Sequence, residues 1–238
     1  MNVIVTLTAL NEAKNIGRVI TAIRESGYGC ILVDDGSTDN TREIAASLGA
    51  AVIRHAVNLG QGYAVLTSFK AALTEDCDII IEMDADGQHD PAQIPRFIEK
   101  LETTRADIVV GSRILGSNYS TAPFFRRTFL PYFTWIINRL SGYTMTDSMC
   151  GFRAFRKESL VRVAGLLNDM LEPQYLAAEM FLRFARAGLT VAEVPIDLKE
   201  RSSGISYKGL ARYGFGVIKA ITRVLVDKSY RHLRQPCE

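Results

Sequence analysis

Short aliphatic runs alternate with amphipathic stretches through the first part of this 238-residue chain, and this alternation constrains the fold more than any other feature. The runs have the length and β-branched composition of buried strands, whereas the stretches between them carry apolar residues at helical spacing. Such an alternation predicts an α/β fold with a parallel, doubly wound sheet whose ligands bind outside the carboxyl ends of the strands. We expect strands at 3–7, 30–33, 51–54 and 78–83, and helices at 16–23, 41–48 and 64–73.

The chain contains no internal repeat, low-complexity tract or linker, so one main domain is the simplest interpretation. We expect this domain to cover 1–208, with a nucleotide-binding half at 1–111 and an acceptor half at 112–208. An amphipathic helix and tail would occupy 209–238. Further helices are expected at 91–101, from residue 159 and at 175–187, and further strands at 106–110, 147–156 and 191–196.

The apolar run that ends at Met83 stops abruptly in carboxylates, as a central strand does where it opens into a site. Asp84 and Asp86 are two residues apart, so they share one face if the strand continues. Two adjacent carboxylates repel each other unless a cation or a proton joins them, and hard oxygen ligands suit Mg²⁺ or Mn²⁺ completed by water and phosphate. An acidic turn that merely ends the strand is the alternative.

Two other predicted strands also end in acid-bearing polar segments, at 10–12 and 34–39. The carboxyl ends of parallel strands meet at one edge of a sheet, so these segments and 84–90 should lie on a common rim. This convergence favours a site for a metal and a diphosphate over an isolated acidic turn.

Composition excludes several classes of protein. A net charge of +2 gives no support to nucleic-acid binding. The four cysteines form no C-x-x-C pair, which argues against structural zinc and against a disulfide framework. The amino terminus lacks the basic segment of a signal peptide, and no uncharged apolar run is long enough to span a membrane. We therefore expect a cytoplasmic protein.

Residues 122–145 mix aromatic and aliphatic side chains with arginine. A core helix with arginine at its edge explains this pattern. A helix at the membrane interface explains it too, because aromatic bodies enter the lipid boundary there and arginine meets phosphate. The stretch 210–226 is also amphipathic and carries Lys219 and Arg223. Both stretches are candidates for peripheral contact with the inner face of the membrane.

A series of ordered motifs closely resembles the family 2 glycosyltransferases of GT-A fold, and within that family the dolichol-phosphate mannose synthase-like, polyprenyl-phosphate glycosyltransferase branch. The resemblance implies a mostly parallel Rossmann-like sheet flanked by helices. It also implies an inverting, metal-dependent hexosyltransferase that uses a nucleoside-diphosphate sugar. The motifs are 8–12, 33–39, 58–60, 84–89, 111–113, Asp147 with 150–153, and 193–195 with Arg201, Gly204 and Ser206.

On the nucleoside side of the donor, the resemblance assigns binding roles to four residues. Glu12 and Asp35 would accept hydrogen bonds from the ribose and the base. Thr8 and Leu10 would line the base pocket. Turn and cap chemistry is the alternative for Asp35.

At the diphosphate, the resemblance implies that Asp84, Asp86 and Gln88 hold Mg²⁺ or Mn²⁺, so that the metal offsets charge on the departing nucleoside diphosphate. Asp86 is therefore also expected to be catalytic. Gln88 could equally be a solvated loop residue. His89 is expected to orient the loop rather than to act as a base.

On the acceptor side of the site, the resemblance assigns roles to an aspartate and to a set of phosphate-binding residues. Asp147 would be a catalytic base if the acceptor is a hydroxyl, whereas a phosphate acceptor is already ionised and would leave Asp147 to position the donor sugar. Glu179 lies mid-helix among apolar residues and is expected to pair internally with an arginine. The positions that would bind an acceptor phosphate are Arg113, Arg127, Arg201 and Ser206.

Three positions depart from the pattern of the lipid-phosphate branch. Leu10 replaces an aromatic residue, Pro131 replaces a serine, and Tyr207 follows Ser206 where lysine is usual. These departures leave the donor half intact and admit a saccharide or another hydroxyl compound as the acceptor.

The expected partners are a nucleoside-diphosphate sugar donor and a lipid-linked or saccharide acceptor. A homo-oligomer is compatible with the sequence, and nucleic acid is not an expected partner. A sugar-nucleotide binding module without activity is the more distant alternative. A phosphoacceptor receiver domain would leave the second half unexplained, and the segment 8–12 lacks the glycines of a nucleotidyltransferase loop.

Overall fold

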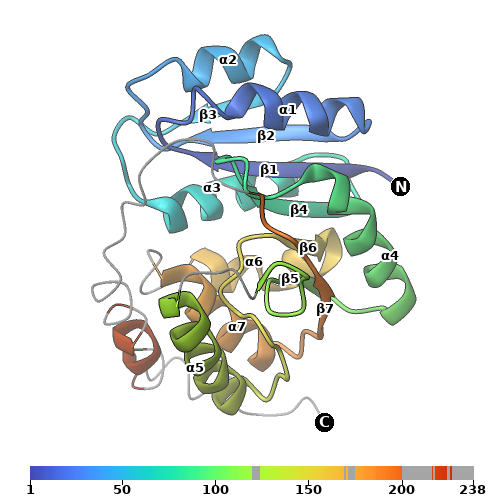
Figure 1. The fold of residues 1–238 in the computed structure, drawn as a ribbon, viewed down its shortest axis with the longest axis vertical. Helices are drawn as coiled ribbons and strands as arrows, with labels where there is room; N and C mark the ends of the chain where they lie inside the picture. The colour runs from blue at the N-terminus through green and yellow to red at the C-terminus, as the bar shows by residue number, and fades with distance from the viewer. Residues whose placement is uncertain are drawn as a thin grey trace.

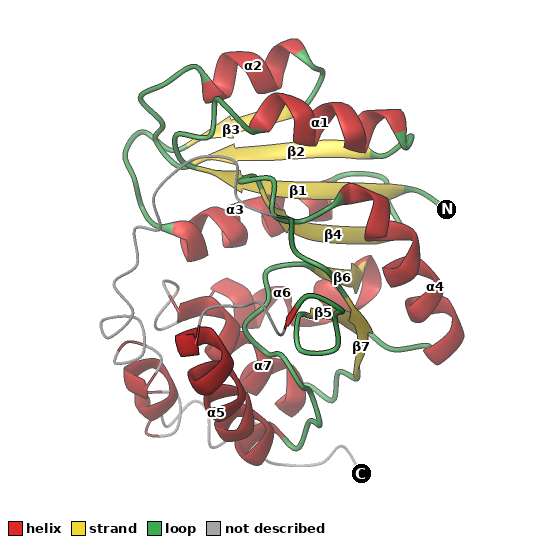
Figure 2. Ribbon diagram, viewed as in Figure 1, coloured by secondary structure: helices red, strands yellow, loops and turns green. Residues whose placement is uncertain are grey.

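The computed structural model describes residues 1–119, 124–168, 170, 175–199, 216, 218–223 and 226. One mixed sheet in the order β3-β2-β1-β4-β6-β5-β7 is flanked by helices (Figures 1 and 2). The predicted α/β fold with a mostly parallel sheet is therefore confirmed. The strands are β1 Val3–Ala9, β2 Gly29–Asp34, β3 Ala51–Arg54, β4 Ile79–Asp84, β5 Ile108–Ser112, β6 Arg153–Arg156 and β7 Val191–Pro195. The helices are α1 Ile16–Glu25, α2 Thr41–Ser47, α3 Gln61–Thr74, the short η1 Pro91–Gln93, α4 Ile94–Thr104, α5 Phe124–Ser141, α6 Lys157–Asn168 and α7 Leu176–Arg186.

In the amino-terminal half of the chain, the sheet extends from β1 in both directions. β2 and β3 follow on one side of β1, whereas β4 lies on its other side, and all these neighbours are parallel. Between β3 and β4, α3 passes back over β2 and β1 and contacts both. Right-handed crossovers consequently put α1 and α2 on one face of the sheet and α3 on the other. The change of direction between β1 and β4 is the point where doubly wound sheets bind ligands.

β6 is the antiparallel strand of the sheet and lies between β4 and β5. The predicted strand at 147–156 begins only at Arg153, because the preceding residues run across the rim as a loop. Gly151 belongs to this loop and packs against Asp84. A Cβ atom at position 151 would lie 3.2 Å from the Asp84 Oδ2 atom, so any side chain there would crowd the Asp84 carboxylate.

Aromatic side chains pack against both faces of the sheet at β6. The Phe155 ring meets the rings of Phe69 on α3 and Phe184 on α7, with centroid distances of 5.1 and 6.5 Å. On the opposite face, Phe152 stacks on Phe97 of α4 at 4.3 Å. These rings are fully buried, and each contributes about 1.5–3 kcal/mol by leaving water.

α5 and α7 pack against each other beside the sheet. α7 carries the buried Glu179, whose carboxylate accepts from Arg183 at 2.6 Å, so the predicted internal arginine partner is confirmed. None of the helices in the described residues combines the length and apolarity needed to cross a bilayer. Most of the amphipathic helix predicted at 210–226 lies outside the described residues, although 218–223 is helical.

Candidate active site

The carboxyl ends of β1, β2 and β4 meet on one rim, as the sequence predicts. Thr8 is in register with Asp84 of β4, and Ala9 is in register with Asp34 of β2. The loops that follow are bonded together, because the Asn11 amide donates to Ser37 Oγ at 2.9 Å and the Asn11 side chain accepts from the Thr38 amide at 2.8 Å.

The predicted nucleoside residues Thr8, Leu10 and Glu12 all lie on this rim. Thr8 and Leu10 are half-buried, which leaves part of each side chain open to a ligand. Glu12 is 9% exposed, and its carboxylate accepts from the Asn15 side chain at 2.7 Å. The Glu12 amide donates to Thr41 Oγ at 2.8 Å, which fixes the loop to the start of α2.

Asp35 holds the loop that leads into α3. Its two carboxylate oxygens accept from the amides of Leu59 and Gly60 at 3.0 and 2.8 Å. His55 Nδ1 lies 2.7 Å from Asp35 Oδ1, and His55 Nε2 lies 3.0 Å from Thr67 Oγ1 on α3. Sequence reasoning missed His55, although it directly follows the third predicted strand and could have been found by the same strand-end criterion.

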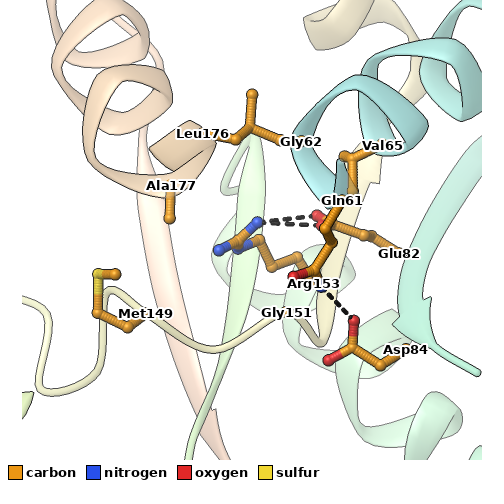
Figure 3. Close-up of a pocket in the computed structure, with 10 residues that line it drawn as sticks. All are labelled: Gln61, Gly62, Val65, Glu82, Asp84, Met149, Gly151, Arg153, Leu176 and Ala177. Atoms are coloured by element: carbon orange, nitrogen blue, oxygen red, sulfur yellow. Dashed lines mark hydrogen bonds and ion pairs between the residues drawn. The ribbon is translucent and has the colours of Figure 1, made fainter. Parts of the chain in front are cut away.

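Asp84 borders a pocket of about 150 Å³ between α3, β4, β6 and the start of α7 (Figure 3). Gln61, the first residue of α3, donates to Asp84 Oδ1 at 2.8 Å. Sequence reasoning gave Gln61 no role. Nothing local indicates its partner, which is 23 residues away.

Glu82 and Arg153 form a buried ion pair in the same pocket, with 3.0 Å between Arg153 Nη1 and Glu82 Oε2. Burial raises the pKa of Glu82 to about 7, against the lowering effect of the arginine. Arg153 Nε is buried and has no hydrogen-bond partner. The pocket is therefore polar at its base, where Figure 3 shows the guanidinium beside Glu82.

The loop after β4 is tightly organised. Asp86 Oδ1 accepts from the Gln88 amide at 3.0 Å, and the Gln88 carbonyl accepts from the Lys199 amide at 2.9 Å. His89 Nδ1 accepts from the Asp84 amide at 3.1 Å. Burial lowers the pKa of His89, against the raising effect of Asp84 and Asp86. A neutral, buried histidine that accepts a backbone hydrogen bond orients this loop.

The carboxylates of Asp84 and Asp86 fit a divalent cation held jointly with a ligand. Both residues are half-buried. The described part of the chain gathers no group of three or more His, Cys, Asp or Glu that could enclose a metal ion. A pair of carboxylates that leaves the other coordination positions to water and phosphate oxygens is typical of Mg²⁺ bound with a diphosphate.

Arg113 and Asp147 form a two-pronged ion pair, with Arg113 Nε and Nη2 at 2.6 and 2.9 Å from the carboxylate oxygens. Asp147 is fully buried and also accepts from the Arg113 and Met149 amides. Glu193 fixes the backbone here, since its carboxylate accepts from the Thr146 and Asp147 amides.

The other predicted acceptor residues are Arg127, Arg201 and Ser206. Arg127 is exposed on α5. Arg201 and Ser206 lie outside the described residues.

A doubly wound sheet with an antiparallel sixth strand, and with an Asp-x-Asp motif at its switch point, is the arrangement expected of the GT-A fold. The chain belongs to glycosyl transferase family 2, whose family model matches residues 4–163. It is therefore a family 2 glycosyltransferase.

Two relatives put the chain in the branch that the motifs indicate. The undecaprenyl-phosphate mannosyltransferase of Micrococcus luteus is 33% identical over 218 residues, which cover 87% of each chain. The dolichyl-phosphate hexose transferase of Haloferax volcanii is 32% identical over 231 residues, or 95% of each chain. The predicted similarity to dolichol-phosphate mannose synthase-like enzymes is confirmed.

A solved structure shares the fold. Glucosyl-3-phosphoglycerate synthase from Mycobacterium tuberculosis, in complex with Mn²⁺, UDP and glucosyl-3-phosphoglycerate, superposes with a TM-score of 0.64 at 21% identity. The match covers 94% of this chain and 78% of that one.

Proposed function

We propose that this enzyme transfers a hexose from a nucleoside-diphosphate sugar to a polyprenyl phosphate, with inversion at the anomeric carbon. The observation that carries the proposal is the position of Asp84, which ends β4 at the switch point beside Thr8. The names of the two relatives support a polyprenyl-phosphate acceptor. The Mn²⁺ and UDP bound by the solved structure support the donor class.

In this proposal the nucleoside lies over the ends of β1 and β2. Thr8 and Leu10 contact the base, and Glu12 and Asp35 accept hydrogen bonds from the base and ribose. Asp35 already holds the amides of Leu59 and Gly60, so it shapes the wall of the nucleoside site as well as contacting the ligand.

The diphosphate lies beside Asp84 and Asp86, which would hold Mg²⁺ or Mn²⁺ together with Gln88. When bound, the cation offsets negative charge on the departing nucleoside diphosphate. Gln61 keeps one oxygen of Asp84 in a fixed direction. The adjoining pocket with Arg153 and Glu82 at its base accommodates the sugar, because hydroxyl groups can donate to a carboxylate and accept from a guanidinium.

A phosphate acceptor removes the need for a general base. One of its oxygens forms the new bond to the anomeric carbon while the bond from that carbon to the diphosphate oxygen breaks. Asp147 would have to break its ion pair with Arg113 to take up a proton. We assign Asp147 to holding Arg113, whose guanidinium attracts the acceptor phosphate. Arg127, Arg201 and Ser206 are proposed to extend that phosphate site.

The test is a panel of labelled sugar nucleotides offered to a polyprenyl phosphate, with Mn²⁺, with Mg²⁺ and with EDTA. We expect transfer from one donor, loss of transfer in EDTA, and loss of at least 100-fold in Asp86→Asn. The matched control is Asp76→Asn, an exposed carboxylate that precedes β4 at its opposite end and should leave turnover unchanged.

Two outcomes would each overturn one part of the proposal, the first its acceptor and the second its activity. Transfer to a saccharide but not to the polyprenyl phosphate would favour a hydroxyl acceptor, which the departures at Leu10 and Pro131 admit. Donor binding without transfer to any acceptor in the panel would favour a binding module.

A further inference from the structure

The pocket beside Asp84 follows two neighbouring strands. Asp84 and Glu82 lie two residues apart on β4, and both line the pocket. Side chains two residues apart on a strand point to the same face and are separated by about 6.6–6.8 Å along it. Arg153 of β6 is in register with Glu82, and Gly151, just before β6, lies against the Asp84 carboxylate. The pocket therefore extends from Asp84 at one end to the Glu82–Arg153 pair at the other (Figure 3).

The Arg153 guanidinium is held in place but keeps hydrogen-bond donors for a ligand. Its Nη1 atom donates to both oxygens of Glu82, at 3.2 and 3.0 Å. Its Cζ atom lies 5.5 Å from the centroid of the Phe181 ring. Among the residues that the structure describes, none accepts from Arg153 Nε, although this atom is buried. A guanidinium carries five N–H groups, so most of them remain available, and a buried N–H without an acceptor is unfavourable.

The side walls of the pocket are apolar. They are formed by Val65 of α3, Met149 of the loop before β6, and Leu176 and Ala177 of α7. A pyranose ring has the same division, with C–H groups on its faces and hydroxyl groups on its edge. The faces of the ring can pack on these walls while hydroxyl groups on its edge meet the Glu82–Arg153 pair. A carboxylate accepts and a guanidinium donates, so the pair can satisfy two neighbouring hydroxyl groups.

The direction of the pocket determines which hydroxyl groups reach the pair. In the proposed function the diphosphate lies beside Asp84, so the anomeric carbon is at that end of the pocket. C4 is the ring atom opposite the anomeric carbon, and C3 is its neighbour. The two residues of strand between Asp84 and Glu82, about 6.6–6.8 Å, are enough to hold one pyranose ring. The hydroxyl groups on C3 and C4 are therefore the ones that meet Glu82 and Arg153.

We propose that the Glu82–Arg153 pair determines the specificity for the donor sugar by binding the hydroxyl groups on C3 and C4. Equatorial hydroxyl groups extend in the plane of the ring toward the pair, whereas an axial one points at the apolar walls. The substrate is therefore a hexose with both groups free and equatorial, as in glucose and mannose, and not galactose. This role of the pair rests on the proposed function, which puts the diphosphate at Asp84.

The wild-type protein with altered donors tests the proposal directly. The probes are the UDP and GDP forms of glucose and mannose, each compared by calorimetry, with Mn²⁺ present, with its 4-deoxy and 6-deoxy forms. Loss of the C4 hydroxyl should weaken binding by about tenfold or more, because its hydrogen bonds go to charged groups. The 6-deoxy form keeps the hydroxyl groups on C3 and C4 and should bind as its parent does. Equal binding of the parent and the 4-deoxy donor would overturn the proposal, and so would equal losses in the two deoxy forms.

Variants assign the discrimination to the pair. Arg153→Lys removes the planar edge of donors, and Glu82→Gln removes the charge of the acceptor. In each variant, the ratio of the affinities for the parent and the 4-deoxy donor should fall toward one, because the altered partner no longer distinguishes them. This ratio compares two donors on the same protein, so a loss of stability does not change it. The matched control is Arg183→Lys, which alters the buried ion pair with Glu179 on α7 and should keep the wild-type ratio. An equal fall in the control would contradict the assignment.

Binding measured without an acceptor separates the role of the pair from the proposed function. A wild-type protein that discriminates against the 4-deoxy donor in binding, yet transfers sugar to no acceptor, would overturn the proposed function and leave the role of the pair standing. Transfer with the same kcat/KM from the parent and the 4-deoxy donor would overturn the role of the pair and leave the proposed function standing.

Discussion

Gln61, the first residue of α3, donates a hydrogen bond from its side-chain amide to Asp84, the last residue of β4, at 2.8 Å. This bond joins the turn after β3 to the carboxylate proposed to hold the metal. It fixes one oxygen of Asp84, and the absence of a side chain at Gly151 leaves room for the whole carboxylate.

Gln61→Ala should therefore weaken metal dependence rather than the fold. Loss of a residue that orients a metal ligand typically costs 10–100-fold in metal affinity or activity. We expect the Mn²⁺ concentration for half-maximal transfer to rise by about tenfold or more, with an unchanged unfolding temperature because Gln61 is exposed. Lys70→Ala, another exposed residue of α3, is the control. An identical Mn²⁺ dependence in Gln61→Ala would show that the bond has no role in metal binding.

Asp35→Ala should loosen the loop between β3 and α3. The amides of Leu59 and Gly60 would lose their carboxylate acceptor, and hydrogen bonds to charged groups contribute about 1.5–3 kcal/mol each. Hydrogen exchange at these two amides should accelerate at least tenfold. His55→Ala keeps both bonds and should leave that exchange closer to wild type. Protection that persists in Asp35→Ala would mean that other contacts hold the loop.

The effects of substitutions at Arg113 and Asp147 on the free energy of unfolding should be coupled. Arg113→Ala leaves Asp147 buried without its guanidinium, and breaking one side of a buried ion pair costs about 3–5 kcal/mol. Adding Asp147→Asn removes the uncompensated charge, so the double variant should recover part of the loss in urea unfolding. Transfer activity should stay low in both variants, because the proposed phosphate site lacks its arginine. Additive losses of stability would contradict the coupling.

Asp107 should make the fold sensitive to acid. Burial alone would raise its pKa, but hydrogen bonds from Ser159 and Thr190 and the charge of Arg162 outweigh burial and lower the pKa below its ordinary value of 3.8. The stabilisation is therefore fully present above the ordinary pKa and is lost as pH falls through the lower, folded-state pKa. The free energy of unfolding should differ between wild type and Asp107→Asn at pH 7, and this difference should shrink below about pH 4. A difference that is constant across this range would show that the carboxylate charge is irrelevant.

Much of the rim could be predicted because its residues follow strands that are evident in the sequence. Asp35 and Asp84 each end or follow an aliphatic run, and parallel strands bring such ends together. His55 follows a strand in the same way, but its pairing with Asp35 could not be predicted, and Gln61 occurs in a turn without a distinctive pattern. A turn residue's partner depends on where another strand ends, which its own neighbours in sequence do not encode.

The sequence by itself determined the alternation of strands and helices, the acids at the strand ends and the family motifs, since each depends on residues close together in the chain. Only the tertiary structure decided that β6 enters antiparallel between β4 and β5, which brings Arg153 to Glu82 across 71 residues. It also decided that Arg113 binds Asp147 across 34 residues, and that Tyr132 and Trp135 face solvent. These outcomes depend on the packing of distant segments, where burial and charge pairing between residues far apart in sequence select one arrangement.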